Sequence, residues 1–303
     1  MKELNGIILK ATSGRFEILD ENGNLQSCAA RGLFRHNKTK PLAGDRVKMT
    51  HVDGQSVLVS EIYPRKNEFL RPSMANLEVL IVTFSVTNPA PTPLFIDQVL
   101  SIAHHNEIQT AVVITKADLD WNGVTYWRDL YLSSGVPVFV TDAQGNGVED
   151  LRLFLQRECK HLTVAFSGAS GVGKSTLINR LFPRLTLEVG EVSLKTERGR
   201  HTTRHVELYP ISDKENTGYI ADTPGFSLLD FERFNFFDKE DLAYNMREFR
   251  DYIGECRYTK CSHTKEEGCA ILEAVKEGKI SKSRHDSFLE IYASLKNKNK
   301  WDK

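Results

Sequence analysis

The sequence predicts a multidomain chain, with a small N-terminal β-barrel, a central α/β domain and a mostly helical C-terminal domain that binds a metal. Three observations lead to this prediction. Short β-type runs broken by turn residues fill the first 66 residues, strands and helices then alternate up to residue 229, and three cysteines with one histidine gather at 256–269. We therefore predict domains at 1–66, 67–229 and 230–303, in line with the number expected for 303 residues.

Composition and charge are those of an ordinary globular chain. Apolar residues make up 40% and charged residues 26%, and we find neither a membrane span nor the apolar core of a signal peptide. We expect a cytoplasmic protein that does not bind membranes. Residues 1–71 carry twelve basic against eight acidic side chains, and residues 270–303 carry eight against five. The two basic ends indicate an anionic partner, although such small excesses are also typical of solvated surfaces.

The N-terminal domain is predicted to be a five-stranded OB-fold barrel, because several short strands fall within 70 residues. Its β-type runs are residues 6–9, 16–19, 46–49 and 57–59. Such barrels often bind nucleic acid through basic and aromatic side chains, but many small barrels bind other ligands. The side chains of this kind are Arg31, Phe34, Arg35, His36, Lys38 and Lys40. Residues 63–67 are predicted to form a linker.

The central domain alternates strands with helices. Alternation of this kind predicts a largely parallel sheet that is covered by helices on both faces. Strands are expected at 77–84, 110–115, 136–140, 162–166, 206–209 and 218–221, and helices at 94–108, 124–132, 148–159 and 174–182.

The most specific motif is a phosphate-binding loop. Residues 168–175 read G-x-x-x-x-G-K-S between a strand and a helix, a context that argues against a chance glycine-rich turn. Backbone N–H groups and the helix N-terminus would surround the phosphates, Lys174 would reach the β- and γ-phosphates, and Ser175 would ligate Mg²⁺. The predicted nucleotide-binding residues here are Gly168, Ala169, Ser170, Gly171, Val172, Gly173, Lys174, Ser175 and Thr176.

Two further motifs indicate which base is bound. Thr115-Lys116-Ala117-Asp118 resembles the guanine-reading N-K-x-D, whose carboxylate accepts from guanine N1–H and N2–H₂, donors that adenine does not present in that arrangement. Thr141-Asp142-Ala143 resembles the loop whose backbone N–H meets guanine O6. Thr115 stands where Asn is usual, a conservative departure that we expect to loosen one loop contact.

The order of the motifs is unusual. Asp222-Thr223-Pro224-Gly225 fits the switch motif D-x-x-G, in which Asp222 holds Mg²⁺ through water and the Gly225 N–H senses the γ-phosphate. The guanine motifs precede the phosphate loop, whereas ordinary GTPases have them last. The chain is therefore predicted to be circularly permuted, with the switch at the end of the domain.

Residues 197–204 occupy the place of the first switch loop. A threonine hydroxyl there would complete the Mg²⁺ coordination, and Thr203 is favoured with Thr202 as the alternative. Phe226 follows Gly225 where Ras-like enzymes carry a catalytic Gln, and a phenyl ring cannot orient water. His201 is the candidate for that task, although a histidine in such a loop is by itself more typical of an ordinary surface residue.

The cysteine cluster has the spacing of a metal site. Cys256, Cys261, His263 and Cys269 offer three thiolates and an imidazole within 14 residues, which suits tetrahedral Zn²⁺ with no open position and hence a structural role. The alternative is three free cysteines that meet a histidine by chance.

Together these motifs resemble the RsgA family, also called YjeQ or YloQ, of circularly permuted GTPases. The resemblance covers nearly the whole chain and rests on residues 71–76, 115–118, 168–175, 199–203, 222–226 and the cysteine cluster. The sequence departs from the family at Glu78, where Asp is common. Potassium-dependent GTPases often carry Asn at the loop position of Gly171, so this residue does not support potassium activation.

The resemblance implies an OB-fold, a GTPase domain and a zinc domain. It also implies hydrolysis of GTP to GDP that the small (30S) ribosomal subunit stimulates, and a role in late maturation of that subunit through its 16S rRNA. We expect a monomer. Two other classes stay open: a metabolic kinase or ATPase, against which Asp118 argues, and an RNA-binding protein whose nucleotide is only structural, which GTP turnover would exclude.

Overall fold

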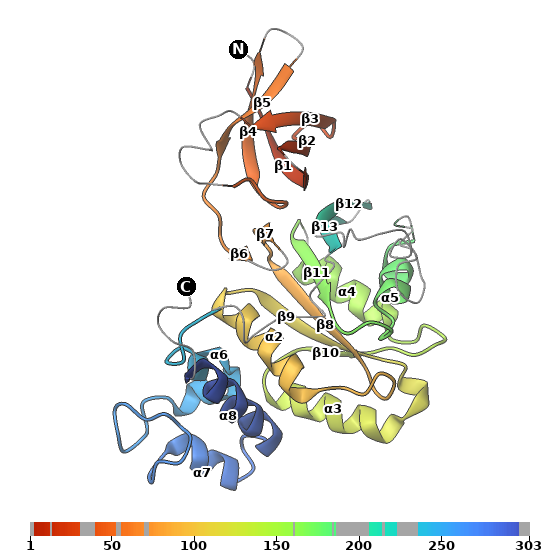
Figure 1. The fold of residues 1–303 in the computed structure, drawn as a ribbon. Coiled ribbons are helices and arrows are strands. Elements are labelled where there is room, and N and C mark those ends of the chain that lie inside the picture. Colours follow the sequence, from red (N-terminus) through yellow and green to blue (C-terminus); the bar gives the residue numbers. More distant parts are fainter. Residues whose placement is uncertain are drawn as a thin grey trace, which may run out of the picture.

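A computed structural model shows the chain in three parts (Figure 1). A barrel lies at one end, a sheet with helices on both faces forms the centre, and the C-terminal helices pack beside α2 (Pro93–His105). The structure describes residues 3–12, 14–30, 40–52, 56–69, 73–159, 161–183, 185, 206–213, 216–222 and 236–296. Throughout these ranges, every helix falls short of the length and apolar character that a bilayer crossing demands.

The N-terminal strands close into a five-stranded barrel, as predicted. Their order is β1-β2-β3-β5-β4, and β4 pairs again with β1. They are β1 (Glu3–Thr12), β2 (Arg15–Asp20), β3 (Leu25–Ala30), β4 (Arg46–Val52) and β5 (Ser56–Ile62). Four of the five contain a β-type run named from the sequence. The fifth, β3, reads L-Q-S-C-A-A and lacks an alternating row of large apolar residues.

Alternating burial gives the barrel a core of its own. In β2, Phe16 and Ile18 are buried whereas Arg15 and Glu17 are exposed. The core consists of Leu4, Ile8, Phe16, Ile18, Cys28, Val47, Met49 and Val59. Asp20 ends β2 and accepts hydrogen bonds from two backbone N–H groups in the following turn, at 2.9 and 2.8 Å. These bonds fix the β2–β3 turn.

The central sheet has the order β10-β9-β8-β11-β13-β12. Its first five strands are parallel, and β12 runs antiparallel to β13. The strands are β8 (Val79–Ser85), β9 (Gln109–Thr115), β10 (Val138–Val140), β11 (Thr163–Ser167), β12 (Glu207–Asp213) and β13 (Asn216–Asp222). The sheet is therefore largely parallel, as the alternation of strands and helices predicted.

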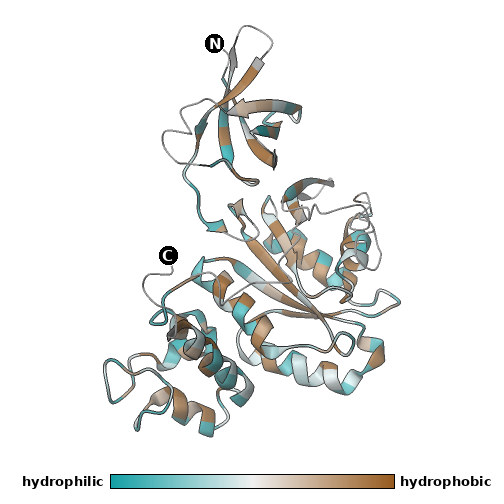
Figure 2. Cartoon of the chain, in the orientation of Figure 1, coloured by the Kyte–Doolittle hydropathy of each residue, from teal (hydrophilic) through white to brown (hydrophobic). Residues whose placement is uncertain are grey.

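Helices cover both faces of this sheet. Leu80 and Val82 of β8 belong to the apolar cluster that includes α2 and α3 (Trp121–Ser133), whereas Val79 and Ile81 belong to the cluster that includes α4 (Val148–Glu158) and α5 (Lys174–Leu181). A strand buried on both faces is a near-continuous apolar run, as in β8 (V-L-I-V-T-F-S), and Figure 2 shows the central strands as largely hydrophobic.

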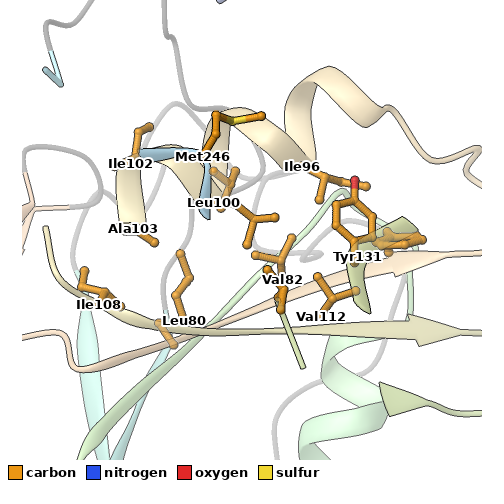
Figure 3. Packing of buried hydrophobic residues seen from close by; sticks show 14 of the residues in the cluster. Leu80, Val82, Ile96, Leu100, Ile102, Ala103, Ile108, Val112, Tyr131 and Met246 are labelled. Atoms are coloured by element: carbon orange, nitrogen blue, oxygen red, sulfur yellow. The ribbon is translucent and has the colours of Figure 1, made fainter. Parts of the chain in front are cut away.

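Helix α2 also joins the sheet to the C-terminal domain. Its Ile96 and Leu100 lie over the sheet near Val82, and Met246 from the C-terminal domain reaches the same cluster (Figure 3). That domain contains α6 (Leu242–Asn245), the 3-10 helix η3 (Arg247–Tyr252), α7 (Ala270–Lys276) and α8 (Lys282–Lys296).

A buried ion network reinforces this junction. Arg284 of α8 is only 1% exposed and binds Asp97 of α2 and Glu248 of η3, with 2.6 Å between Arg284 Nε and Glu248 Oε1. Burial alone would lower the pKa of Arg284, but the two carboxylates raise that pKa above its ordinary value. The guanidinium therefore stays charged in the core, where its partners compensate it.

The barrel is attached by polar contacts and a short hairpin, β6 (Glu68–Phe69) and β7 (Met74–Ala75). Arg65 lies in the predicted linker, and its Nε is 2.7 Å from Oδ1 of the buried Asp45. On the other side, β1 pairs with β12 at Lys10 and Glu207, whose side chains form an ion pair of 2.7 Å. Arg65 thus ties the linker to the barrel, and β1 ties the barrel to the edge of the central sheet.

Candidate functional site

The phosphate-binding loop turns sharply between β11 and α5. Gly168 has a φ of 147°, and a Cβ there would lie 2.0 Å from the carbonyl oxygen of Thr83, so only glycine fits. Gly171 and Gly173 also have positive φ values, of 79° and 97°. Lys174 opens α5 and its Nζ donates to the carbonyl oxygens of Gly168 and Ala169, at 2.7 and 2.8 Å. The turn leaves the N-terminus of α5 facing the loop, the arrangement that binds phosphate.

Several predicted residues lie around this loop. Ser175 and Thr176 stand in the first turn of α5, and β13 ends at Asp222 beside β11, where Ala165 pairs with Ala221. The structure describes only the backbone of Asp222. The predicted residues His201, Thr202, Thr203 and Gly225 lie outside the described residues, as do Arg31, Phe34, Arg35, His36 and Lys38 of the barrel.

The two base-reading motifs come together at the carboxyl ends of β9 and β10. Lys116 has a φ of 56°, which turns the chain into the 3-10 helix η1 (Ala117–Leu119). This turn places Asp118 at the surface of the site, where its Oδ1 accepts a hydrogen bond of 2.9 Å from the Ala143 N–H. A carboxylate and a backbone donor therefore stand side by side, as the two predicted motifs require.

The first of these motifs also touches the phosphate loop. The Thr115 hydroxyl lies 2.6 Å from the carbonyl oxygen of Val172, and Lys116 Nζ donates to the carbonyl oxygen of Gly171 at 2.8 Å. Thr115 thus keeps a hydrogen bond to the loop although it stands where Asn is usual. These contacts fix the distance between the base-reading motifs and the phosphate loop.

Arg180 is a site residue that sequence analysis did not find. Its Nη1 donates to the carbonyl oxygen of Asp142 at 3.0 Å and its Nη2 to that of Ala143 at 2.6 Å. The available signal was its place four residues after Thr176, on the same face of α5, but no motif marks it. A cavity of about 230 Å³ is lined by Thr115 and Lys116 of the first base-reading motif, by residues 141–143 of the second, and by Val172, Thr176 and Arg180.

The loop that carries Ala143 is braced from within by Asp142. Its carboxylate accepts hydrogen bonds from the backbone N–H groups of Gly145 and Asn146 at 2.8 and 2.9 Å. The Asn146 side chain and these N–H groups hold the pKa of Asp142 below its ordinary value. Asp142 is therefore a charged brace for the loop rather than a group that titrates near neutral pH.

The predicted metal ligands Cys256, Cys261, His263 and Cys269 come together in the C-terminal domain. Their ligand atoms all lie within 4.8 Å of one another. His263 Nδ1 is 3.6 Å from Cys256 Sγ and 3.4 Å from Cys269 Sγ, and the latter two sulfurs are 3.9 Å apart. Tetrahedral ligands at ordinary metal–sulfur and metal–nitrogen lengths lie roughly 3.6–3.8 Å apart. The donor set and its spacing fit a four-coordinate metal.

Glu266 braces the metal-ligand loop. Its carboxylate accepts from the backbone N–H groups of Ser262 at 3.0 Å and Thr264 at 3.0 Å, and from the Ser262 hydroxyl. Burial would raise the pKa of Glu266, but these hydrogen bonds lower it to about 2. His263 lies between the two braced residues with a φ of 59°. The fixed charge of Glu266 therefore supports a strained ligand position.

Comparison with known proteins identifies the family. The family description "RsgA GTPase" matches residues 62–232, and "RsgA N-terminal domain" matches residues 5–58. The Small ribosomal subunit biogenesis GTPase RsgA of Alkaliphilus metalliredigens is 37% identical over 295 residues, which are 96% of this chain and 97% of that protein. The chain belongs to the RsgA family of GTPases.

RsgA proteins of known structure share the whole architecture. The crystal structure of YjeQ from Thermotoga maritima is 30% identical with a TM-score of 0.83, and covers 98% of this chain and 100% of that one. The structure of YloQ, a circularly permuted GTPase, is 31% identical with a TM-score of 0.79, and covers 99% of this chain and 98% of that one. The predicted family, domain types and permuted motif order are thereby confirmed.

Proposed function

We propose that this GTPase hydrolyses GTP to GDP and phosphate at the cavity beside Asp118, and that it acts in late maturation of the small ribosomal subunit, which stimulates the reaction. The observation that carries the guanine assignment is the Asp118 carboxylate beside the Ala143 N–H, tied to the phosphate loop by Thr115 and Lys116. The ribosomal role is supported by relatives named for biogenesis of that subunit, which match along their full length.

The base is read by two groups of opposite polarity. Asp118 accepts from guanine N1–H and N2–H₂, while the Ala143 N–H donates to O6. An adenine ring would bring an amino group against the Ala143 N–H and would leave the carboxylate without N1–H. Both mismatches would bury unpaired polar groups, which is why such a site selects its base strongly.

The phosphates are bound by residues 168–176. Loop N–H groups and Lys174 would hold the β- and γ-phosphates. Ser175 and one of the switch threonines, with Thr203 ahead of Thr202, would ligate the Mg²⁺ that neutralises the phosphates, and Asp222 would hold it through water. A water oxygen bonds to the γ-phosphorus while the bond to the β-phosphate oxygen breaks. His201 orients that water, and the Gly225 N–H binds the γ-phosphate.

The C-terminal cluster holds one structural Zn²⁺ through Cys256, Cys261, His263 and Cys269, since three thiolates and an imidazole leave a tetrahedral zinc ion no open position. The domains divide at 1–66, 67–229 and 230–303. The protein works as a cytoplasmic monomer, and its basic ends contact phosphates of the 16S rRNA. This last assignment is supported by the excess of basic over acidic residues at both ends.

The decisive experiment is GTP turnover with and without purified small subunits. We expect slow turnover by the protein alone, a large rate increase with small subunits and none with large subunits. ATP should neither be hydrolysed nor compete. A GTP turnover rate that does not change when small subunits are added would contradict the ribosomal role. Equal hydrolysis of ATP and GTP would contradict the proposed recognition of guanine.

The role of Asp118 has its own test, the substitution Asp118→Asn. The amide has the shape of the carboxylate, but its NH₂ group would face the N–H donors of guanine. GTP binding should therefore weaken by roughly 2–5 kcal/mol, the scale for one partner of a charged hydrogen-bond pair that the bound base covers. Xanthosine triphosphate, whose C2 carbonyl suits the amide, should bind the variant better than GTP does. Competition binding measures both, and unchanged GTP affinity would refute the assignment.

The metal is tested by elemental analysis of the purified protein and of Cys261→Ser. We expect one zinc per chain in the first and little in the second, whose C-terminal domain should become sensitive to proteolysis, because the binding energy of such a metal is folding energy. Cys159→Ala removes a thiol from a different part of the chain and should retain the zinc. Untreated protein without zinc would contradict the proposal.

A further inference from the structure

Arg180 connects the helix after the phosphate loop with the loop that reads guanine O6. Its two terminal nitrogens donate to consecutive carbonyl oxygens, those of Asp142 and Ala143. The carbonyl oxygen of Arg180 itself accepts from Arg152 Nη2 at 2.9 Å. The arginine is therefore anchored at its backbone while its planar guanidinium binds both carbonyls.

The planar geometry of the peptide group explains how these contacts act on the Ala143 N–H. The Asp142 carbonyl and the Ala143 N–H belong to one planar trans peptide, so they point in opposite directions. Arg180 binds the oxygen end, and the nitrogen end donates to Asp118 Oδ1. Holding the oxygen end therefore fixes the direction of the Ala143 N–H, which donates to Asp118 in this structure and to O6 in the proposed complex.

Other contacts on this loop do not replace the arginine. The Gly145 N–H reaches the Asp142 carbonyl at 3.2 Å but lies closer, at 2.8 Å, to the Asp142 carboxylate. For the Ala143 carbonyl, the described hydrogen bond is that of Arg180 Nη2. A cationic donor makes the stronger bond and polarises the peptide, which makes the opposite N–H a better donor.

We propose that Arg180 is a positioning residue for the base: it aims the Ala143 N–H at the 6-oxo group and so sets the preference for 6-oxopurine nucleotides. The inference rests on the proposed reading of guanine by Asp118 and Ala143. It adds a residue from the phosphate-loop helix to base recognition, where it acts through the backbone without touching the base.

The test is the affinity of three nucleoside diphosphates for the full-length protein and for Arg180→Met, which keeps the apolar stem and removes the donors. GDP and IDP both present O6, and we expect both to bind roughly tenfold more weakly to the variant, the scale of one charge-assisted hydrogen bond. Since sulfur is a weak acceptor, 6-thio-GDP uses the N–H little, and should lose less than about threefold. Arg180→Lys should recover part of the GDP affinity.

The control is Arg157→Met, an exposed arginine on α4, which should bind all three ligands as the wild type does. Equal losses of GDP and 6-thio-GDP in Arg180→Met would overturn the proposal, because they would mean a general loss of structure. Unchanged GDP affinity would overturn it too. A wild-type protein that binds ADP as well as GDP would instead refute the reading of guanine itself, so the two failures are distinguishable.

Discussion

The two terminal domains are joined to the central sheet in different ways. The C-terminal domain shares one apolar cluster with the sheet and α2, to which it contributes residues from Phe237 to Leu295. The barrel has a separate core and adds Ile7, Leu9 and Ala43 to the shared cluster. Burial of apolar surface is the main stabilising term in such junctions, so the C-terminal junction should be much the stronger.

The polar contacts show the same contrast. At the C-terminal junction the side chains of Arg284 and Asp97 are 1% and 0% exposed, whereas those of Lys10 and Glu207 at the barrel are 32% and 33% exposed. A cavity of about 630 Å³ lies between barrel and sheet, lined by Asn5, Arg46, Glu78 and other residues. Exposed pairs are screened by water and salt, and buried pairs are screened much less.

This difference assigns the two domains different mechanical roles. The C-terminal domain and α2 should move as one body with the sheet, so any shift in the sheet would be passed on to the metal site. The barrel pairs with β12, the strand that follows the predicted first switch loop at 197–204, and should change position at little cost. The following substitutions test this contrast.

The largest effect is expected from Arg284→Met. The substitution leaves the carboxylates of Asp97 and Glu248 buried without their cation, which should lower the free energy of unfolding by about 3–5 kcal/mol. Urea unfolding followed by circular dichroism measures this loss. Lys282→Met, on the same helix and in an exposed pair with Asp286, is the control and should change stability by less than about 0.5 kcal/mol. A small effect of Arg284→Met would show that the network does not hold the junction.

An intermediate effect is expected from His104, which joins α2 to α6. Its Nδ1 lies 2.8 Å from the Asn245 carbonyl oxygen, and burial lowers the pKa of His104 to about 3. Because the unfolded chain binds this proton near pH 6.5 and the folded chain does not, stability should fall as the pH falls below about 6.5.

At pH 5 this histidine should account for about 2 kcal/mol of lost stability, relative to pH 7. His104→Gln cannot take up the proton, so its stability should depend less on pH over this interval. The difference between the two unfolding curves isolates His104 from the other groups that titrate. Identical slopes for the two proteins would contradict the assignment.

Local patterns predicted the parts of the site that are continuous in sequence. The phosphate loop, the metal ligands and strand β8 are each defined by residues close together in the chain. Their glycines, their cysteines and their apolar run are each compatible with only a few local structures. The Asp118 motif was found in the same way. The permuted order followed from the sequence positions of these motifs.

Contacts between distant segments could not be predicted. Arg284 and Asp97 lie 187 residues apart and Arg180 and Ala143 lie 37 apart, and neither pair carries a local signal. Strand β3 was missed because pairing with β2 and β5, rather than its own composition, makes it a strand. The pairing of β1 with β12 likewise depends on how two domains dock.

The smallest effect is expected from Lys10→Met at the barrel. The hydrogen bond to Glu207 raises the pKa of Lys10, but both side chains are about one third exposed, so the pair should contribute less than about 1 kcal/mol. That contribution should shrink further in high salt. A double-mutant cycle with Glu207→Gln separates the pair from the loss of either side chain. A coupling energy near that of the buried Arg284 network would mean that the barrel is held as firmly as the C-terminal domain, and the contrast between the two junctions would fail.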